Sequence, residues 1–362
     1  MVKINNINFC NFRNFQNQDF LFEKKTNIFF GNNGTGKTNV LEGISLIGKG
    51  RGIRNAQLNN LINRNKETFL INASVSINEN NYETQIQSVF LNDKYKKIIN
   101  INGDTSKEIL SFFESSISFL LFLPEMERLF QSSPSTRRNF IDRLIFSHVK
   151  NYNSTINKYK KKLLERSKIL QENNFDKSWI EVVEKDISFL ALQIYQLRIQ
   201  QLNLLNENIV ILNRNNNYAF KINLKILDEF YSSSLDIDTY LNYLKNFREY
   251  DKKYGGSKIG PHKSDISVTV DNGFEASQLS TGQQKTIVLL ILIAQCNYLI
   301  NDKKIQPIFL LDEICSHLDS NNRQILLDMI NNFDIQLFLT GTEKAMFSFI
   351  STNVKFYNIE EE

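Results

Sequence analysis

The chain has 362 residues and a net charge of +4, from 43 Lys and Arg against 39 Asp and Glu. This length allows two domains or one large, elaborated domain, and a hydrophobic share of 41% excludes wholesale disorder. Cys10, Cys296 and Cys315 form no C-x-x-C pair, which argues against a disulfide framework, a structural zinc site and a redox dithiol. The sequence opens with no secretory leader, and its longest apolar run, 287–294, is too short to span a bilayer. We therefore expect a cytoplasmic protein without a membrane partner.

The N-terminal region predicts two short strands, 2–9 and 19–22, around a polar corner at 11–14. A further apolar run, 27–30, comes directly before a G-x-x-x-x-G-K-T sequence, and apolar residues at helical spacing follow it. That strand, loop and helix context is the one in which such a sequence binds phosphate. The loop consists of Gly31, Asn32, Asn33, Gly34, Thr35, Gly36, Lys37 and Thr38.

This loop predicts a nucleoside triphosphate and Mg²⁺ as ligands. Its glycines let backbone N–H groups turn toward a triphosphate, and the helix that follows presents its positive end to the anion. We expect Lys37 to reach the outer phosphates, as a catalytic residue, and the Thr38 hydroxyl to bind Mg²⁺.

The next stretches predict a basic loop and an antiparallel sheet. Residues 48–54 alternate Gly with Lys and Arg, which fits a flexible link and a second anion contact equally well. From 68 to 101, short apolar runs are separated by Asn and Asp turns, which predicts an antiparallel appendage on the nucleotide-binding sheet.

Helical periodicity then takes over and predicts a mostly helical insertion up to about Tyr254. We therefore expect a nucleotide-binding domain made of 1–125 and 255–362, with an inserted domain at 126–254. Residues 137–168 carry ten Lys and Arg against two acidic residues. This stretch is either a solvated helix face or a surface for DNA phosphates. The candidates for DNA contact are Arg137, Arg138, Lys158, Lys161 and Lys162.

The C-terminal third carries three further pieces of a nucleotide site. Residues 279–285 precede a strongly apolar helix, whose N-terminus is an anion site. An apolar strand, 308–311, ends in Asp312, which suits Mg²⁺, and Glu313, which can orient or deprotonate an attacking water. The stretch 316–319 (S-H-L-D) follows at once, and a second buried strand, 336–340, comes after it.

In this order, the pieces resemble the ATP-binding-cassette ATPase heads of the structural-maintenance-of-chromosomes class, an α/β fold with a mixed sheet. Within that class the chain resembles the RecF recombination mediators from Lys3 to Thr342. The stretches that carry the resemblance are Asn11–Asn14, Gly31–Thr38, Ser133–Arg138 through Asp142, Gly260–Asp265 and Ser280–Lys285.

The resemblance implies an ATP-dependent homodimer. Ser280, Gly282 and Gln283 of one protomer would complete the site built on Lys37 of the other. Arg13 and Asn14 would contact the nucleotide, or simply form the turn between two strands. The resemblance also implies a slow, DNA-stimulated ATPase that binds duplex DNA near single-strand gaps and helps load RecA with RecO and RecR, located on the nucleoid.

Some positions depart from the family pattern. Thr281 stands where transporter cassettes have Gly, and Glu313 where RecF relatives often have a second Asp. Asn139 interrupts the Arg run, and a Q-loop glutamine has no secure match, 123–125 being the nearest candidate.

Three other functions use the same phosphate chemistry. A transporter ATPase subunit would need a membrane partner, and the basic helical insertion does not fit one. A long-armed or zinc-hook ATPase would need a longer insertion or a C-x-x-C pair. A DNA clamp in which ATP binding matters and turnover is incidental stays open.

Overall fold

The computed structural model describes residues 2–48, 50, 52–172, 176–216, 221–270, 273–315 and 320–360. The chain divides into two compact units. We call residues 1–127 with 281–362 the head unit, and residues 128–280 the insertion unit. The chain returns to the head at 281, later than the expected residue 255, because residues 255–280 form a strand and loops that pack within the insertion.

The first sheet of the head unit is antiparallel throughout, with strand order β2-β1-β4-β5-β6. β1 buries alternate residues on one face, and a bulge between Ile4 and Asn6 restores the alternation so that Ile7 and Phe9 face the core. β1 and β2 meet at Phe12 and Phe15, so both strands are longer than predicted and leave only Arg13 and Asn14 as the turn. The strands are β1 Val2–Phe12, β2 Phe15–Leu21, β4 Leu70–Ile77, β5 Asn80–Leu91 and β6 Lys94–Ile101.

The second sheet of the head unit is parallel throughout, with order β12-β3-β11-β10-β7. β10 lies inside it and is apolar and fully buried along its length, as expected for a parallel strand covered on both faces. The strands are β3 Thr26–Phe30, β7 Phe119–Phe122, β10 Ile308–Leu311, β11 Gln336–Gly341 and β12 Val354–Asn358.

Aromatic rings and one buried amide join the two sheets. Phe22, beside the first sheet, stacks edge-on against Phe338 of β11 with ring centroids 4.8 Å apart. The fully buried side chain of Gln336 accepts from the Ile4 N–H and donates to the Ile4 carbonyl, each at 2.8 Å. The predicted α/β class is therefore confirmed, with the antiparallel strands forming a complete second sheet.

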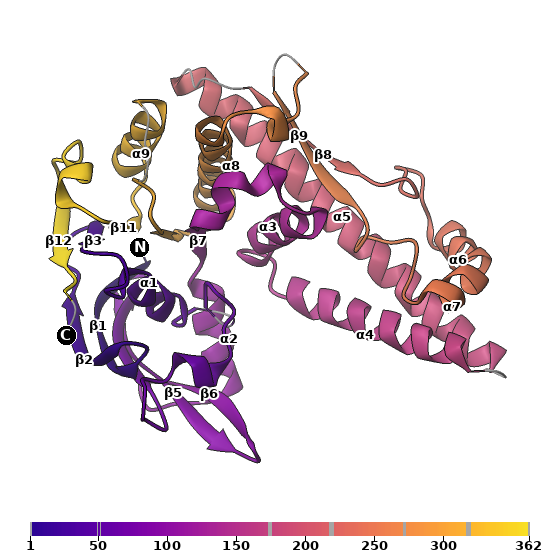
Figure 1. The fold of residues 1–362 in the computed structure, drawn as a ribbon, viewed down its shortest axis with the longest axis horizontal. Helices are drawn as coiled ribbons and strands as arrows, with labels where there is room; N and C mark the ends of the chain where they lie inside the picture. The colour runs from indigo at the N-terminus through magenta and orange to yellow at the C-terminus, as the bar shows by residue number, and fades with distance from the viewer. Residues whose placement is uncertain are drawn as a thin grey trace. The chain divides into compact units, whose positions relative to one another are not determined.

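α1, α2 and α8 each contact a strand of these sheets, and α9 packs against α8 (Figure 1). α8 is apolar and long enough to cross a membrane, but 83% of its most apolar window is buried inside the protein, which identifies it as a core helix. The helices are α1 Lys37–Ser45, α2 Lys107–Ser116, α8 Thr281–Asn301 and α9 Ser320–Asn332, with 3₁₀ turns η1 Leu58–Leu61, η2 Pro124–Gln131 and η4 Lys344–Phe347.

The insertion unit is mostly helical, as predicted, and also contains one antiparallel strand pair, β8 with β9. α4 and α5 pack side by side (Figure 1) around a core that includes Tyr159, Ile187 and Tyr240. Its elements are α3 Pro134–Phe146, α4 Tyr152–Gln171, α5 Lys177–Asn216, β8 Ile222–Leu227, α6 Ile237–Asn246, α7 Arg248–Tyr254, β9 Asp265–Val270 and η3 Ala276–Gln278.

The two stretches 133–142 and 260–265 meet inside the insertion unit. Ser133 caps α3, and Arg137 on the first turns of that helix forms a bidentate ion pair with Asp265. Arg198 of α5 donates to both carboxylate oxygens of Asp142, at 2.8 and 2.9 Å, and to the Pro261 carbonyl at 2.5 Å. These two stretches therefore hold α3, α5 and the start of β9 together.

Gly260 and His262 lie in a tightly packed cluster of polar groups in the same unit. Gly260 has φ +128°, and a Cβ there would lie 2.2 Å from the Tyr159 hydroxyl and 2.5 Å from that of Tyr240. The Tyr159 hydroxyl lies 2.8 Å from Nδ1 of His262, whose Nε2 lies 3.1 Å from the Ser257 carbonyl. These contacts suit a neutral ring that accepts at Nδ1 and donates at Nε2. Burial lowers the pKa of His262 from 6.5 to about 4.

Acidification should destabilise the insertion unit through His262. The unfolded chain takes up a proton below pH 6.5 and the folded unit only near pH 4, so stability is full above pH 6.5 and falls in between. At pH 5 we expect a loss of about 2 kcal/mol from this group. Urea unfolding followed by the fluorescence of Trp179, the single tryptophan, measures it at pH 7.5 and pH 5. His262→Gln, which keeps one donor and one acceptor, should show less of this loss; an unchanged pH dependence would contradict the assignment.

Candidate nucleotide-binding site

The parallel sheet brings three loops of the head unit to one edge. β3, β11 and β10 are neighbours, and the carboxyl ends of neighbouring parallel strands lie together. The phosphate loop follows β3, Thr340 stands near the end of β11, and Asp312 with Glu313 follow β10. Residues distant in the sequence thus meet at a place where α/β sheets commonly bind ligands.

The loop has the backbone conformations that its glycines permit. Gly34 and Gly36 have φ of +93° and +105°, which side chains rarely allow. At Gly31 a Cβ would lie 2.2 Å from the Ile359 carbonyl, and at Gly36 it would lie 2.5 Å from the Asn14 amide. The loop therefore needs glycine at 31 and 36 for space as well as for backbone conformation.

Lys37 begins α1 and points back over the loop. Its Nζ donates to the carbonyls of Gly31 at 2.8 Å and Asn32 at 2.6 Å, and the residue is only 5% exposed. Burial lowers the pKa of Lys37, whereas the charges of Glu313 and Asp312 act to raise it. A cation held at the rim of an N–H-lined loop is placed to bind phosphate oxygens.

Thr38, Asp312 and Thr340 form a hydrogen-bonded cluster beside the loop. The Thr38 hydroxyl lies 2.9 and 3.0 Å from the two carboxylate oxygens of Asp312, which is 3% exposed. The fully buried Thr340 hydroxyl donates to Asp312 at 2.7 Å and accepts from the Glu313 backbone N–H at 2.8 Å. Glu313 has φ +50°, so this contact holds it in a left-handed conformation with an exposed side chain.

The same cluster is the candidate Mg²⁺ site. A hydroxyl and a carboxylate at the end of a phosphate loop are the hard oxygen donors that Mg²⁺ prefers, together with water and phosphate oxygens. Thr38 and Asp312 lie within 3.0 Å of each other, so one ion can contact both. The donor set therefore fits Mg²⁺, and the metal stays a prediction.

Thr340 was not predicted as a site residue, and its effect on hydrolysis can be measured. Thr340→Val keeps the shape but leaves the Asp312 oxygen and the Glu313 N–H without their shared partner. Removing a buried hydrogen bond costs about 1–3 kcal/mol, so we expect kcat for ATP hydrolysis to fall about tenfold or more. Thr340→Ser should restore most of the rate, with ATP affinity near that of the parent in both variants. Equal rates in the Val and Ser variants would contradict this role.

Arg13 and Asn14 contact the loop and its helix. Arg13 donates to both carboxylate oxygens of the buried Glu42 on α1, at 2.8 and 3.1 Å. The Asn14 amide donates to the Thr35 carbonyl at 2.9 Å and accepts from Asn39 at 2.8 Å. Both residues thus form the turn, Arg13 holding the helix after the loop and Asn14 the loop itself, and their contact with a nucleotide stays a prediction.

The element at 279–285 lies where α8 begins. Ser280 and Gln283 are exposed, while Gly282 is partly buried. Lys285 of the same element is buried and pairs with Glu127 at 2.7 Å. The described part of the chain therefore presents Ser280 and Gln283 to solvent, where a second molecule can reach them. Residues 316–319, and Lys49 and Arg51 of the basic loop, lie outside the described residues.

The five candidates for DNA contact differ in whether their charged groups have partners within the described residues. The Arg137 guanidinium donates hydrogen bonds to Asp265 and to the carbonyls of Phe130 and Ser132. Arg138 donates to the Ser264 carbonyl. Lys162 pairs with Glu165 at 3.2 Å and Asp186 at 3.0 Å. The contacts of Arg137 and Arg138 hold together parts of the insertion unit that lie more than a hundred residues apart in the sequence, whereas the Lys162 pairs lie at the surface. A role of these residues at DNA stays a prediction. Lys158 and Lys161 make no ion pair or hydrogen bond within the described residues, and their contact with DNA likewise stays a prediction.

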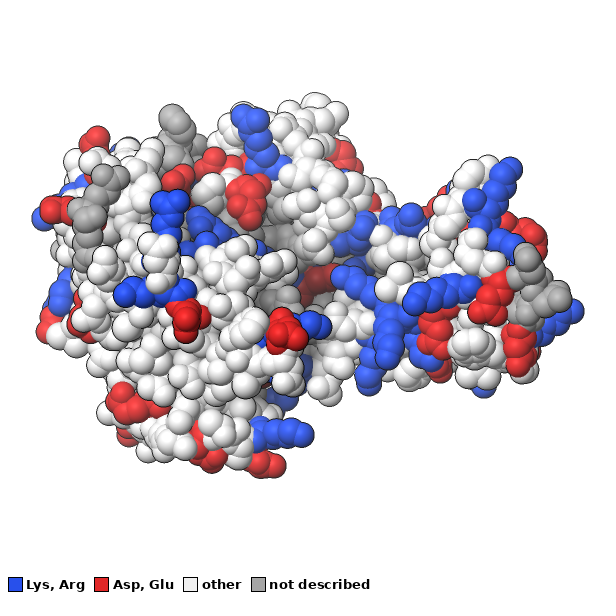
Figure 2. Space-filling view, turned by 60° about the horizontal axis from the view of Figure 1, so that its bottom comes forward, with Lys and Arg blue, Asp and Glu red and all other residues white. Residues whose placement is uncertain are grey.

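Both signs of charge are visible on the surface of the protein. Figure 2 shows Lys and Arg side chains interspersed with Asp and Glu, including over the helices of the insertion unit.

Comparison with known proteins covers nearly the whole chain. Residues 3–362 match the model of the RecF/RecN/SMC N-terminal domain family. A protein of Rickettsia conorii, described as DNA replication and repair protein RecF, is 31% identical, with 94% of each chain covered.

Solved structures share the fold. A structure described as the recombination mediator protein RecF-ATP in the RecFOR pathway superposes with a TM-score of 0.82 at 24% identity, covering 99% of this chain and 96% of that one. An Smc head domain with an extended coiled coil from Pyrococcus furiosus gives a TM-score of 0.53 at 16% identity, covering 100% and 94%.

Proposed function

Since the chain belongs to the RecF family, within the group of RecF, RecN and SMC N-terminal domains, we propose that it is an ATP-hydrolysing protein of DNA replication and repair. The observation that carries the proposal is the cluster of Lys37, Thr38, Asp312 and Glu313 at one edge of the parallel sheet. Family membership favours this function over the transporter subunit, and we propose a cytoplasmic, nucleoid-associated location to go with it.

Each residue of the cluster has a separate role in ATP hydrolysis. The loop N–H groups and Lys37 bind the β- and γ-phosphates. Glu313 orients a water and accepts its proton as the water oxygen bonds to the γ-phosphorus and the bond to the β-phosphate oxygen breaks. The products are ADP and phosphate, and the proton leaves later from Glu313. Thr38 and Asp312 would hold Mg²⁺, which supplies neutralisation of the phosphate charge when bound.

ATP is proposed to hold two copies of the chain together as a homodimer. Asn32, Asn33 and Gly34 of the loop are exposed, and Ser280 lies exposed at the N-terminus of α8. If the Ser280 element of a second copy covers the γ-phosphate, the closed dimer is favoured only while that phosphate is present. Hydrolysis then removes the contact and opens the dimer.

DNA is proposed as the ligand that this cycle controls. Relatives are described as DNA replication and repair proteins and as a mediator in the RecFOR pathway, so we propose duplex DNA near single-strand gaps as the target. RecO and RecR are the proposed partners in loading RecA. No base-reading element is assigned, so sequence specificity should be low.

Duplex DNA should therefore stimulate ATP turnover. We expect a slow basal rate that rises severalfold with a gapped duplex, and less so as salt increases, because phosphate contacts weaken with salt. A coupled ATPase assay with and without a gapped duplex measures this. A rate that DNA leaves unchanged at every salt concentration would contradict the DNA-repair function and leave an ATPase of another kind.

A further inference from the structure

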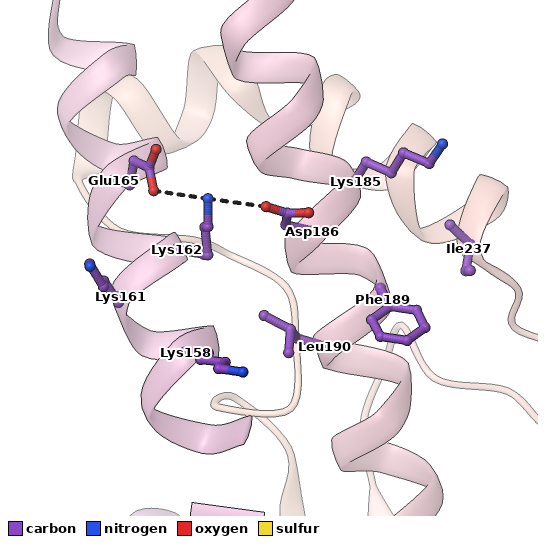
Figure 3. A pocket seen from close by; sticks show the side chains of 9 residues that line it. All are labelled: Lys158, Lys161, Lys162, Glu165, Lys185, Asp186, Phe189, Leu190 and Ile237. Carbon is purple, nitrogen blue, oxygen red and sulfur yellow. Dashed lines mark ion pairs between the residues drawn. The ribbon is translucent and has the colours of Figure 1, made fainter. Parts of the chain in front are cut away.

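The insertion unit contains an open groove between α4 and α5, with one edge on α6. Its volume is about 610 Å³, within the range of ligand-binding clefts. Figure 3 shows Lys158 extending from α4 toward Leu190 on α5, with the ring of Phe189 beyond it on the side of Ile237. The lining residues are Lys158, Lys161, Lys162, Glu165, Lys185, Asp186, Phe189, Leu190 and Ile237.

The charge of the groove is positive once its internal pairs are counted. Lys162 bridges Glu165 and Asp186, at 3.2 and 3.0 Å, so one cation satisfies both carboxylates (Figure 3). The other three lysines, Lys158, Lys161 and Lys185, make no ion pair or hydrogen bond within the described part of the chain. They are available to an anionic ligand.

The groove also presents an exposed aromatic ring. Phe189 is 52% exposed, although the other side of α5 carries fully buried core residues such as Ile187 and Ala191. Leu190 and Ile237 extend the apolar surface next to it. A bare phenyl ring among cations is the combination that binds unpaired nucleotides, because every base has a face that can stack and every nucleotide carries a phosphate.

We propose that this groove binds single-stranded DNA, with phosphates at Lys158, Lys161 and Lys185 and a base stacked on Phe189. The proposal rests on the proposed function, because it takes DNA as the ligand of this protein. A duplex offers phosphates but keeps its bases stacked inside, so it cannot use Phe189. An unpaired strand uses both features. The groove would thus give the insertion unit a contact with the single-stranded side of a gap.

An acidic peptide with apolar side chains would match the same charges. We commit to single-stranded DNA because relatives of this chain are described as DNA replication and repair proteins. The two ligands are separable experimentally, since an aromatic replacement at Phe189 preserves stacking on a base.

The test measures binding of fluorescein-labelled oligothymidylate and of a blunt duplex to the full chain. Phe189→Ala should weaken the Kd for oligothymidylate about tenfold, and Phe189→Trp should keep it near the parent value. Blunt-duplex affinity should stay unchanged in both variants. Phe90→Ala, which removes a ring that is 56% exposed on β5, is the matched control and should change neither affinity.

The cations are tested through salt dependence. Lys158→Gln with Lys161→Gln should reduce the slope of log Kd against log salt by about 1.4, or about 0.7 for each phosphate that no longer meets a lysine. Lys94→Gln, at an exposed lysine of β6, is the control. In a Trp179→Phe background, the indole introduced by Phe189→Trp should be quenched by oligothymidylate.

The outcomes separate this inference from the proposed function. Oligothymidylate binding that Phe189→Ala leaves unchanged would overturn the groove proposal and leave the groove to a protein ligand, while the DNA function stands. A parent protein that binds neither oligothymidylate nor duplex would overturn both. Loss of affinity in Phe189→Trp as large as in Phe189→Ala would also contradict stacking.

Discussion

Glu313→Gln should reduce ATP turnover by about 10³-fold while leaving ATP affinity close to that of the parent protein. The amide keeps the size of the side chain but cannot accept the proton of the attacking water, and a positioned general base is worth about 10²–10⁴ in rate. The loop, Lys37 and the Thr38–Asp312 pair, which we propose bind the nucleotide, are untouched. Single-turnover hydrolysis of labelled ATP, together with a filter-binding measurement of ATP affinity, tests both halves of this expectation.

Two control variants accompany Glu313→Gln. Glu83→Gln alters an exposed carboxylate on β5, outside the site, and should leave the rate unchanged. Lys37→Ala should lose ATP binding itself, because it removes the cation that faces the phosphates. A Glu313→Gln protein that turns over ATP at the parent rate would show that another group activates the water.

Arg166→Met should destabilise the insertion unit by about 3–5 kcal/mol. Arg166 is 1% exposed, and its guanidinium pairs with Glu184 at 2.9 Å and Asp251 at 2.6 Å and donates to the Leu244 carbonyl at 2.7 Å. The thioether fills part of the space but leaves Asp251 buried without its cation, which is the costly outcome for a buried ion pair. Urea unfolding followed by Trp179 fluorescence reports on the insertion unit, because this single tryptophan begins α5.

Lys162→Met is the matched control for Arg166→Met. It removes an equally paired cation from the same helix, but one at the surface, where such pairs contribute about 0–1 kcal/mol. A similar urea midpoint for the two variants would mean that the buried network does not stabilise the unit. The slope of the transition should stay constant for the comparison to hold.

The nucleotide site could be predicted because its chemistry is local in sequence. The phosphate loop is contiguous, and Asp312 and Glu313 directly follow a strand whose apolar run is easily recognised. Thr340 was recognised only as the end of a strand. Its contact with Asp312 depends on β11 lying beside β10, and the order of strands in a sheet cannot be read from the sequence of either strand.

The charge pattern of a sequence segment does not show which of its charged residues are paired in the fold. Arg137 and Arg138 belong to a stretch with a large excess of basic residues, yet their partners, Asp265 and Ser264, lie more than a hundred residues further along the chain. A count over a segment cannot include such partners. The predicted end of the insertion, at 254, comes before β9. The pairing of β9 with β8 places β9 in the insertion unit, and this pairing cannot be read from the sequence of either strand.

The most direct test of an ATP-closed dimer is sedimentation of the Glu313→Gln variant with nucleotide and Mg²⁺. Because this variant should bind ATP without hydrolysing it, the predicted result is a dimer with ATP and a monomer with ADP or without nucleotide. Lys37→Ala should remain a monomer under every condition. A Glu313→Gln protein that binds ATP and yet sediments as a monomer at all accessible concentrations would contradict the shared site.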